Sequence, residues 1–243
     1  MNYMPPHILE PVNGLAHTNT FILLHGRSST AEEFANDFFS LTTSKAGTNL
    51  RSRFPTWRWV FPDAGMRWCT SFQDKRSAWF DTFSLEDLRE KEALQIEGLR
   101  DGVHLVREIV EEEVGRLGGH AEKVILGGFS QGSAVALWSV FTGAAMTKGT
   151  LGAFVGLSAW MPFTKEAKEA VVPMADPSTM RIGKLATVFA DILGIGPFMQ
   201  VEAMQERLQM PVYLGHGIDV GDALLLDNDE KADSFFSRTL LSA

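Results

Sequence analysis

The stretch KVILGGFSQGSAVALWSVF, residues 123–141, joins a short apolar run to an alanine-rich segment through a glycine-rich turn. The apolar run ends at Ser130 and predicts a buried strand, because it is short, continuous and rich in β-branched and aromatic residues. The segment after Ser130 predicts a helix that begins at once. A strand, a tight turn and a helix in this order are typical of a parallel sheet wrapped by helices.

Other parts of the chain fit the same architecture. Residues 92–117 carry apolar side chains at spacings of three and four and predict a long amphipathic helix. The stretch 165–197 mixes lysine, alanine, proline and glycine, and we expect it to form a surface excursion. We therefore expect residues 1–243 to form a single α/β domain with a mostly parallel central sheet covered by helices. Four further strands are predicted from the apolar runs FILLHG (21–26), RWVFP (58–62), GAFVGLSA (152–159) and MPVYLGHG (210–217).

The composition excludes several classes of function. A net charge of −8, without a basic stripe, argues against binding to nucleic acid or to an anionic membrane surface. No apolar run approaches the roughly 18 residues that a membrane span needs, so we expect no stable membrane insertion. The single cysteine, Cys69, and the lack of a secretory pattern near the first residue predict a cytoplasmic protein. No residues have the spacing of metal ligands, and we expect no metal site.

The turn itself has the pattern of a catalytic motif. GFSQG matches G-x-S-x-G with Gly128, Ser130 and Gly132, a pentapeptide that arises by chance in about one chain in ten. The strand before it and the helix after it make the match specific, because a strained turn between them would lift the serine hydroxyl above the sheet edge. A phosphate-binding loop is the competing interpretation, but Ser133 follows Gly132 where that loop needs a lysine. We interpret Ser130 as a nucleophile.

A nucleophilic serine also needs donors for the oxyanion that forms on the substrate. The segment LLHGRSST, residues 23–30, turns just past a predicted strand end, where the N–H of Arg27 could pair with that of Gln131. His25 lies in the same segment. We expect it to brace the loop rather than to take part in catalysis.

The chain contains, in this order, the segments FILLHGRSSTAEEF, RSAWFD (76–81), GGFSQGSAVAL, GLSAWMPF (156–163) and MPVYLGHGID (210–219). Together they resemble the acyl-protein thioesterase and phospholipase/carboxylesterase family of the α/β-hydrolase superfamily. The resemblance covers residues 15–219 and implies an α/β-hydrolase fold. It implies hydrolysis of thioesters on S-acylated proteins, or of small acyl esters and lysophospholipids, with no cofactor or metal.

The resemblance also implies roles for individual residues. Ser130 would be the nucleophile, with the backbone N–H groups of Arg27 and Gln131 as oxyanion donors. Three side chains match positions near the family's active-site cleft: Trp79 in WFD, and Trp160 and Met161 in SAWMP. Packing in the core or at the rim is an equally good interpretation of these three side chains.

The sequence departs from the family pattern near its end. The family continues as H-G-x-x-D, but HGIDV places Asp219 one position early. Asp219 is the best candidate for the triad acid, with Asp222 in reserve, and solvent-exposed turn aspartates are the alternative interpretation. The family's catalytic histidine follows the acid, whereas none of this chain's six histidines follows Asp219. We interpret residues 220–243 as a divergent or truncated C-terminus, and we expect the sheet to lack its last strand.

Two hypotheses of different classes follow. The first is a serine hydrolase of the carboxylesterase or acyl-protein thioesterase type, in which Asp219 orients a base that the sequence does not assign. The second is a catalytically impaired pseudo-hydrolase that binds acyl groups or partner proteins on the same scaffold. Serine is a poor nucleophile without a positioned base, so the missing histidine separates the two.

Overall fold

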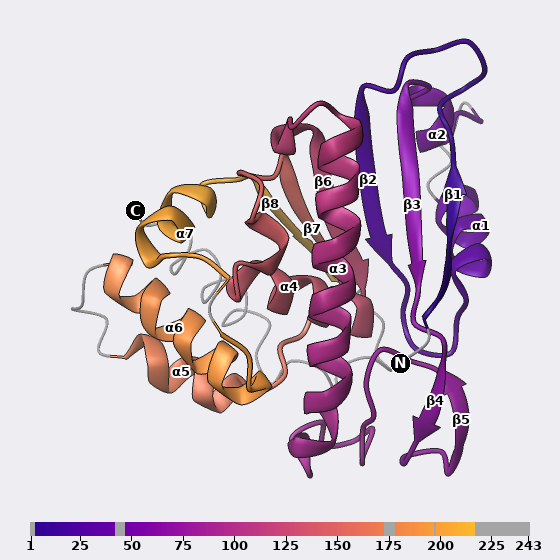
Figure 1. Ribbon diagram of the computed structural model, residues 1–243. Helices are drawn as coiled ribbons and strands as arrows, with labels where there is room; N and C mark the ends of the chain where they lie inside the picture. Colours follow the sequence, from indigo (N-terminus) through magenta and orange to yellow (C-terminus); the bar gives the residue numbers. More distant parts are fainter. Residues whose placement is uncertain (1–2, 42–46, 173–177, 197, 217–243) are drawn as a thin grey trace.

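The computed structural model describes residues 3–41, 47–172, 178–196 and 198–216 (Figure 1). Its larger sheet contains β1 (Met4–Leu9), β2 (Asn19–Leu24), β3 (Trp57–Asp63), β6 (Val124–Phe129), β7 (Ala153–Leu157) and β8 (Val212–Gly215). Within the described residues these strands lie in the order β1-β3-β2-β6-β7-β8. Strand β1 is antiparallel to β3, and the other neighbouring pairs are parallel. The mostly parallel sheet predicted from the sequence is confirmed.

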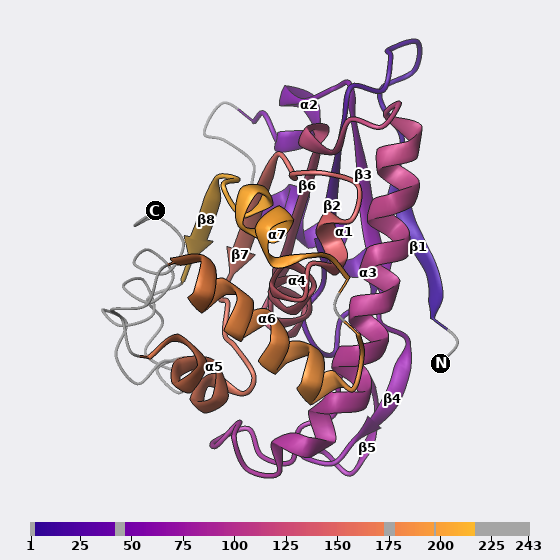
Figure 2. The same cartoon turned by 60° about the vertical axis from the view of Figure 1, so that its left-hand side comes forward.

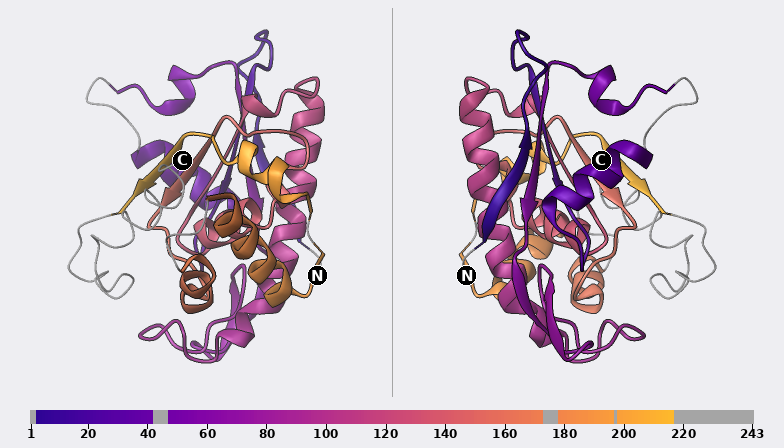
Figure 3. Two further views of the ribbon diagram at one scale, coloured as in Figure 1. Left: turned by 90° about the vertical axis from the view of Figure 1, so that its left-hand side faces the viewer. Right: turned by 90° about the vertical axis from the view of Figure 1, so that its right-hand side faces the viewer.

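Helices cover both faces of this sheet. They are α1 (Ala31–Leu41), α2 (Leu50–Arg53), α3 (Ile96–Arg116), α4 (Gln131–Phe141), α5 (Thr164–Val171), α6 (Ser178–Leu193) and α7 (Val201–Arg207), with 3₁₀ turns η1 (Glu92–Gln95), η2 (Ala121–Lys123) and η3 (Ala144–Met146). Figure 3 shows α3 on one face and α1 and α2 on the other. In β2, Ile22 and Leu24 belong to the core that α3 and α4 cover, whereas Phe21 and Leu23 belong to the core under α1. Alternating side chains of one strand therefore fill two separate cores.

The predicted strands and the long helix are confirmed, but the sequence analysis missed three strands. Strand β1 contains Pro5 and Pro6, which weaken a strand prediction because proline cannot donate to the ladder. Its position at the sheet edge tolerates them, with an irregular register between Met4 and His7. The other two strands, β4 (Met66–Cys69) and β5 (Asp74–Ser77), pair as an antiparallel hairpin beyond the end of β3 (Figure 1).

The expectation of a surface excursion at 165–197 is wrong. This part of the chain forms α5 and α6, and α6 passes over α4 (Figure 2). Phe189 of α6 is fully buried, and its ring stacks on that of Trp138 with centroids 4.2 Å apart. The sequence signal was a helical apolar stripe at spacings of three and four, which the glycine and proline content obscured. Its buried members are Ile182, Leu185, Phe189 and Leu193.

Among the strands that the structure describes, β8 is the outer one on the side away from β1. The predictions for residues 220–243, including the missing last strand, lie outside the described residues, as do Asp219 and Asp222. In the part of the chain that the structure describes, no helix is both long and apolar enough to cross a membrane.

Candidate active site

Ser130 lies in the turn between β6 and α4. Its backbone has φ 51° and ψ −118°, a conformation that residues with a side chain rarely adopt. Two backbone hydrogen bonds hold it there: the Ser130 N–H donates to the Leu157 carbonyl of β7 at 2.9 Å, and the Ala134 N–H donates to the Ser130 carbonyl at 3.1 Å. The residue is half-buried. This is the geometry expected of a nucleophile elbow.

The motif glycines make the turn sterically feasible. A Cβ atom at Gly128 would lie 2.4 Å from the carbonyl carbon of Gly132, across the turn. A Cβ at Gly132 would lie 2.4 Å from the carbonyl oxygen of Leu24, at the end of β2. Both distances are too short for any side chain, so these positions require glycine for close backbone approach.

The loop after β2 passes directly beside the serine. A Cβ built at Gly26 would lie 3.6 Å from the Ser130 Cβ. In the described residues, no acceptor takes the backbone N–H of Arg27 or Gln131. The Arg27 guanidinium is directed elsewhere, donating to the Thr82 hydroxyl at 3.1 Å and lying over the Phe72 ring. Two amide donors without an acceptor in the described part of the chain therefore accompany Ser130, one from each of the two predicted segments.

His25 is fully buried beneath this loop. Its Nε2 accepts the Ala64 N–H at 3.0 Å, so this nitrogen carries no proton. Its Nδ1 therefore carries the proton and donates to the Gly26 carbonyl at 2.7 Å. Burial lowers the pKa of His25 below its ordinary value, which favours the neutral ring. Both ring nitrogens hold backbone, and this arrangement supports a bracing role.

The lowered pKa of His25 predicts a pH dependence of stability. The unfolded chain takes up a proton below about pH 6.5, whereas the folded chain resists it. The free energy of unfolding should therefore fall as pH drops from about 6.5 toward the folded pKa of His25. Urea unfolding at pH 7.5, 6.5 and 5.5 measures this fall, which should be smaller in His25→Gln. Burial also lowers the pKa of His17, so both proteins should carry His17→Gln. Equal pH dependence in the two proteins would show that His25 does not cause the fall in the free energy of unfolding.

Trp79, Trp160 and Met161, which the resemblance places near the cleft, are all buried. Trp79 is fully buried, and its Nε1–H donates to the His25 carbonyl at 2.7 Å. Trp160 packs against the Phe80 ring at 5.7 Å between centroids, and Met161 is buried beside it in the same core. These contacts favour the packing interpretation for Trp79 most strongly, because its polar atom already has a partner. Phe80 lies in the RSAWFD segment that carries the resemblance, but nothing in that segment predicts its contact with Trp160.

No base contacts the serine among the described residues, because none of their side chains hydrogen-bonds to Ser130 Oγ. His216 follows β8 and is exposed. Backbone hydrogen bonds link Ser130 to the end of β8 along the carboxyl ends of the strands. The Ser130 N–H donates to the Leu157 carbonyl of β7, and the N–H of the next residue, Ser158, donates to the Gly215 carbonyl of β8 at 2.7 Å. His216 thus stands at the same carboxyl edge of the sheet as Ser130, two strands away.

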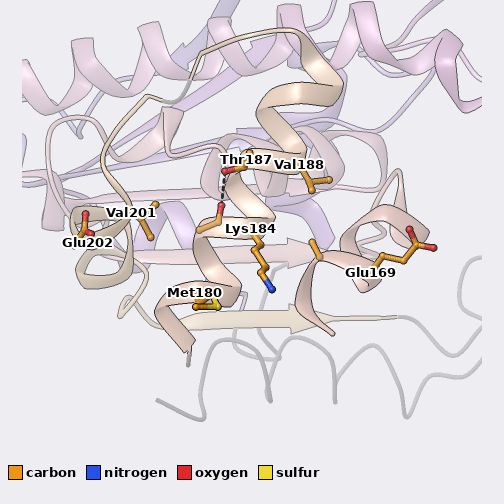
Figure 4. A pocket seen from close by; sticks show the side chains of 9 residues that line it. Glu169, Met180, Lys184, Thr187, Val188, Val201 and Glu202 are labelled. Carbon is orange, nitrogen blue, oxygen red and sulfur yellow. Dashed lines mark hydrogen bonds between the residues drawn. The ribbon is translucent and has the colours of Figure 1, made fainter. Parts of the chain in front are cut away.

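A hollow of about 810 Å³ lies elsewhere, between α5, α6 and α7 (Figure 4). Met180, Val188 and Val201 form much of its apolar lining, with the Glu169 and Glu202 side chains at opposite ends in the close-up. None of its lining residues comes from the turn at Ser130. Nor does the described part of the chain contain three or more His, Cys, Asp or Glu side chains grouped to hold a metal.

Residues 10–182, more than half of the chain, match the model of one protein family, described as phospholipase/carboxylesterase. The chain belongs to the phospholipase/carboxylesterase family. Acyl-protein thioesterase 1 of Cryptococcus neoformans is 31% identical to it over 148 residues. That match covers 60% of this chain and 56% of the Cryptococcus protein, so the chain spans little more than half of that relative's length. Acyl-protein thioesterase 1 of Schizosaccharomyces pombe is 28% identical over 167 residues, 67% of each chain.

The fold of this family member also resembles a solved structure. Acyl-protein thioesterase 2 of Zea mays aligns with a TM-score of 0.54 at 21% identity, over 98% of this chain and 100% of the maize chain. The likeness concerns the fold alone. Together with the family match, it confirms the α/β-hydrolase fold that the resemblance implied.

Proposed function

We propose that this chain is a serine hydrolase of the carboxylesterase or acyl-protein thioesterase type, which cleaves acyl esters or thioesters. The observation that carries the proposal is the strained backbone of Ser130, at φ 51°, beside two amide donors that have no acceptor among the described residues. Strain of this kind persists where the surroundings over-determine it, which is common at active sites. S-acylated proteins, small acyl esters and lysophospholipids are the proposed substrates, with Trp160 and Met161 near the acyl chain.

The reaction would proceed in two steps. Ser130 Oγ attacks the acyl carbonyl carbon and gives up its proton to a base, while the carbonyl electron pair moves onto oxygen. The N–H groups of Arg27 and Gln131 hold this oxyanion. The tetrahedral intermediate collapses, and the thiolate or alkoxide leaves with a proton from the base. Water then attacks the acyl-enzyme in the same way and releases the carboxylic acid.

The positions of the histidines point to one candidate for the base. His25 uses both ring nitrogens on backbone groups. His216 stands two strand spacings from Ser130, about 10 Å between backbones, which two side chains and one bridging water span. We assign the base to His216, with Asp219 as the acid that orients it. The other four lie on other parts of the chain: His7 on β1, His17 just before β2, His104 on α3 and His120 after the end of α3.

The pseudo-hydrolase remains the alternative, favoured by the lack of any described side chain on Ser130 Oγ. A fluorophosphonate probe separates the two functions, because it labels only an activated serine. We expect stoichiometric labelling at Ser130, found by peptide mass spectrometry, and no labelling in Ser130→Ala. A folded protein that stays unlabelled would refute the hydrolase and leave the acyl-binding function, which binding of a fluorescent acyl chain would then measure.

A further inference from the structure

Residues 77–80, Ser77-Ala78-Trp79-Phe80, contact both sides of the proposed oxyanion hole, and we call them the bridging segment. On one side they hold the loop after β2. The Ser77 carbonyl accepts the N–H of Ser28, the residue after Arg27, at 2.7 Å. The Trp79 Nε1–H donates to the His25 carbonyl at 2.7 Å. The loop that presents the Arg27 donor is thus fastened on both sides of that residue.

On the other side the bridging segment holds the start of α4. The Gln131 side chain lies against its backbone and is 2% exposed. Its Oε1 accepts the Trp79 N–H at 3.1 Å, and its Nε2 donates to the Phe80 carbonyl at 3.0 Å. Gln131 therefore has two roles. Its backbone N–H is the proposed oxyanion donor, and its side chain hydrogen-bonds to the bridging segment.

The bridging segment is itself fixed in place. The Arg67 Nε donates to the Ala78 carbonyl at 2.8 Å. Helix α3 also approaches this segment so closely that a Cβ at Gly98 would lie 2.4 Å from the Trp79 carbonyl oxygen and 2.5 Å from the Phe80 Cα. A segment held by buried hydrogen bonds and backed by a helix has little room to shift.

We propose that the bridging segment sets the separation of the two oxyanion donors, with Trp79 and the Gln131 side chain as positioning residues. The proposal rests on the hydrolase function given above. Arg27 and Gln131 lie on two different elements, and oxyanion stabilisation depends on donors that are already in place when charge develops. The indole N–H and the carboxamide connect these elements through the same two residues, Trp79 and Phe80. Trp79 accordingly acts by holding the loop, not by touching the acyl chain.

Trp79→Phe tests this assignment, because it keeps an aromatic ring and removes the N–H that holds His25. We expect kcat for p-nitrophenyl butyrate to fall by about 10–100-fold, the effect of a small misplacement, with KM within about twofold of wild type. Trp138→Phe is the matched control. Trp138 is equally buried, and its Nε1 has no hydrogen-bond partner among the described residues, so its replacement should leave kcat within about twofold. A rise in KM at constant kcat in Trp79→Phe would instead make Trp79 a substrate contact and overturn the proposal.

Amide hydrogen exchange provides a readout that needs no turnover. In Trp79→Phe we expect faster exchange in peptides covering 25–29 and 130–133, and in Trp138→Phe no change at 25–29. The Gln131→Met variant, which keeps the backbone donor, should show the same exchange pattern as Trp79→Phe. The double variant should be no worse in kcat than the poorer single one, because the two side chains act as a unit. If the wild type shows no turnover, the hydrolase proposal fails, and unchanged exchange would separately refute the bridging role.

Discussion

Replacing Ser130 by alanine is expected to lower kcat for short p-nitrophenyl esters by about 10⁴–10⁶-fold, because losing the nucleophile leaves only the oxyanion donors and binding. The folded structure should survive. Alanine accepts the backbone of the turn no worse than serine, and the hydroxyl makes no hydrogen bond to the described residues. Initial rates with wild type and Ser130→Ala, at matched protein concentration and after checking the thermal transition of each, measure the effect.

Ser133→Ala is the matched control for this loss. Ser133 lies in the first turn of α4, and its Oγ is buried without a partner among the described residues. Removing it should leave kcat within about twofold and should not lower stability, because no hydrogen bond is lost. Equal, near-zero rates in wild type and Ser130→Ala would contradict the hydrolase.

The same assay tests the base. His216→Gln should lower kcat by an amount similar to Ser130→Ala, and the double variant should lose no more, because residues of one catalytic unit are not additive. Added imidazole should restore part of the activity of His216→Ala, an effect that a structural role would not produce. Full activity in His216→Gln would rule this residue out as the base.

The second large effect concerns stability, at the opposite end of the sheet. Arg58 of β3 is 5% exposed and Glu113 of α3 is 2% exposed, and the Arg58 Nε donates to the Glu113 carboxylate at 3.1 Å. The other Glu113 oxygen accepts the Thr20 hydroxyl at 2.9 Å. Arg58 also pairs with Glu10 at the surface. Arg58→Met should lower the free energy of unfolding by about 3 kcal/mol, because the buried Glu113 carboxylate then keeps only the Thr20 hydroxyl and Arg116, whose Nε lies 3.4 Å away.

A companion variant distinguishes charge from packing. If the unpaired carboxylate causes the loss, Arg58→Met/Glu113→Met should be more stable than Arg58→Met alone, since replacing both charges by apolar side chains removes the desolvation cost. If lost packing of the arginine stem causes it, the double variant should be no more stable. Urea unfolding curves of the three proteins decide between these causes, with the slope checked for two-state behaviour.

The central part of the fold could be predicted from the sequence because its signals are local. The inner parallel strands β2, β3, β6 and β7 are short apolar runs, and β8 has the same pattern although its side chains are only partly buried. Strand β1 was missed because its two prolines are acceptable only at a sheet edge, and edge position is a property of the assembled sheet. Helix α6 has a local signal, its apolar stripe at spacings of three and four, but the glycine and proline of the surrounding stretch 165–197 favoured a surface segment instead.

The sequence by itself determined the turn at Ser130. Gly128 and Gly132 flank a serine between an apolar run and a helix. The strained turn and the place of Ser130 at the carboxyl end of β6 therefore follow from neighbouring residues. The tertiary structure alone decided what surrounds the serine. Gln131 meets the Trp79 backbone 52 positions away, and Trp79 meets His25 54 positions away. Such partners leave no mark in either segment, because a buried hydrogen bond needs only a donor and an acceptor brought together by the fold.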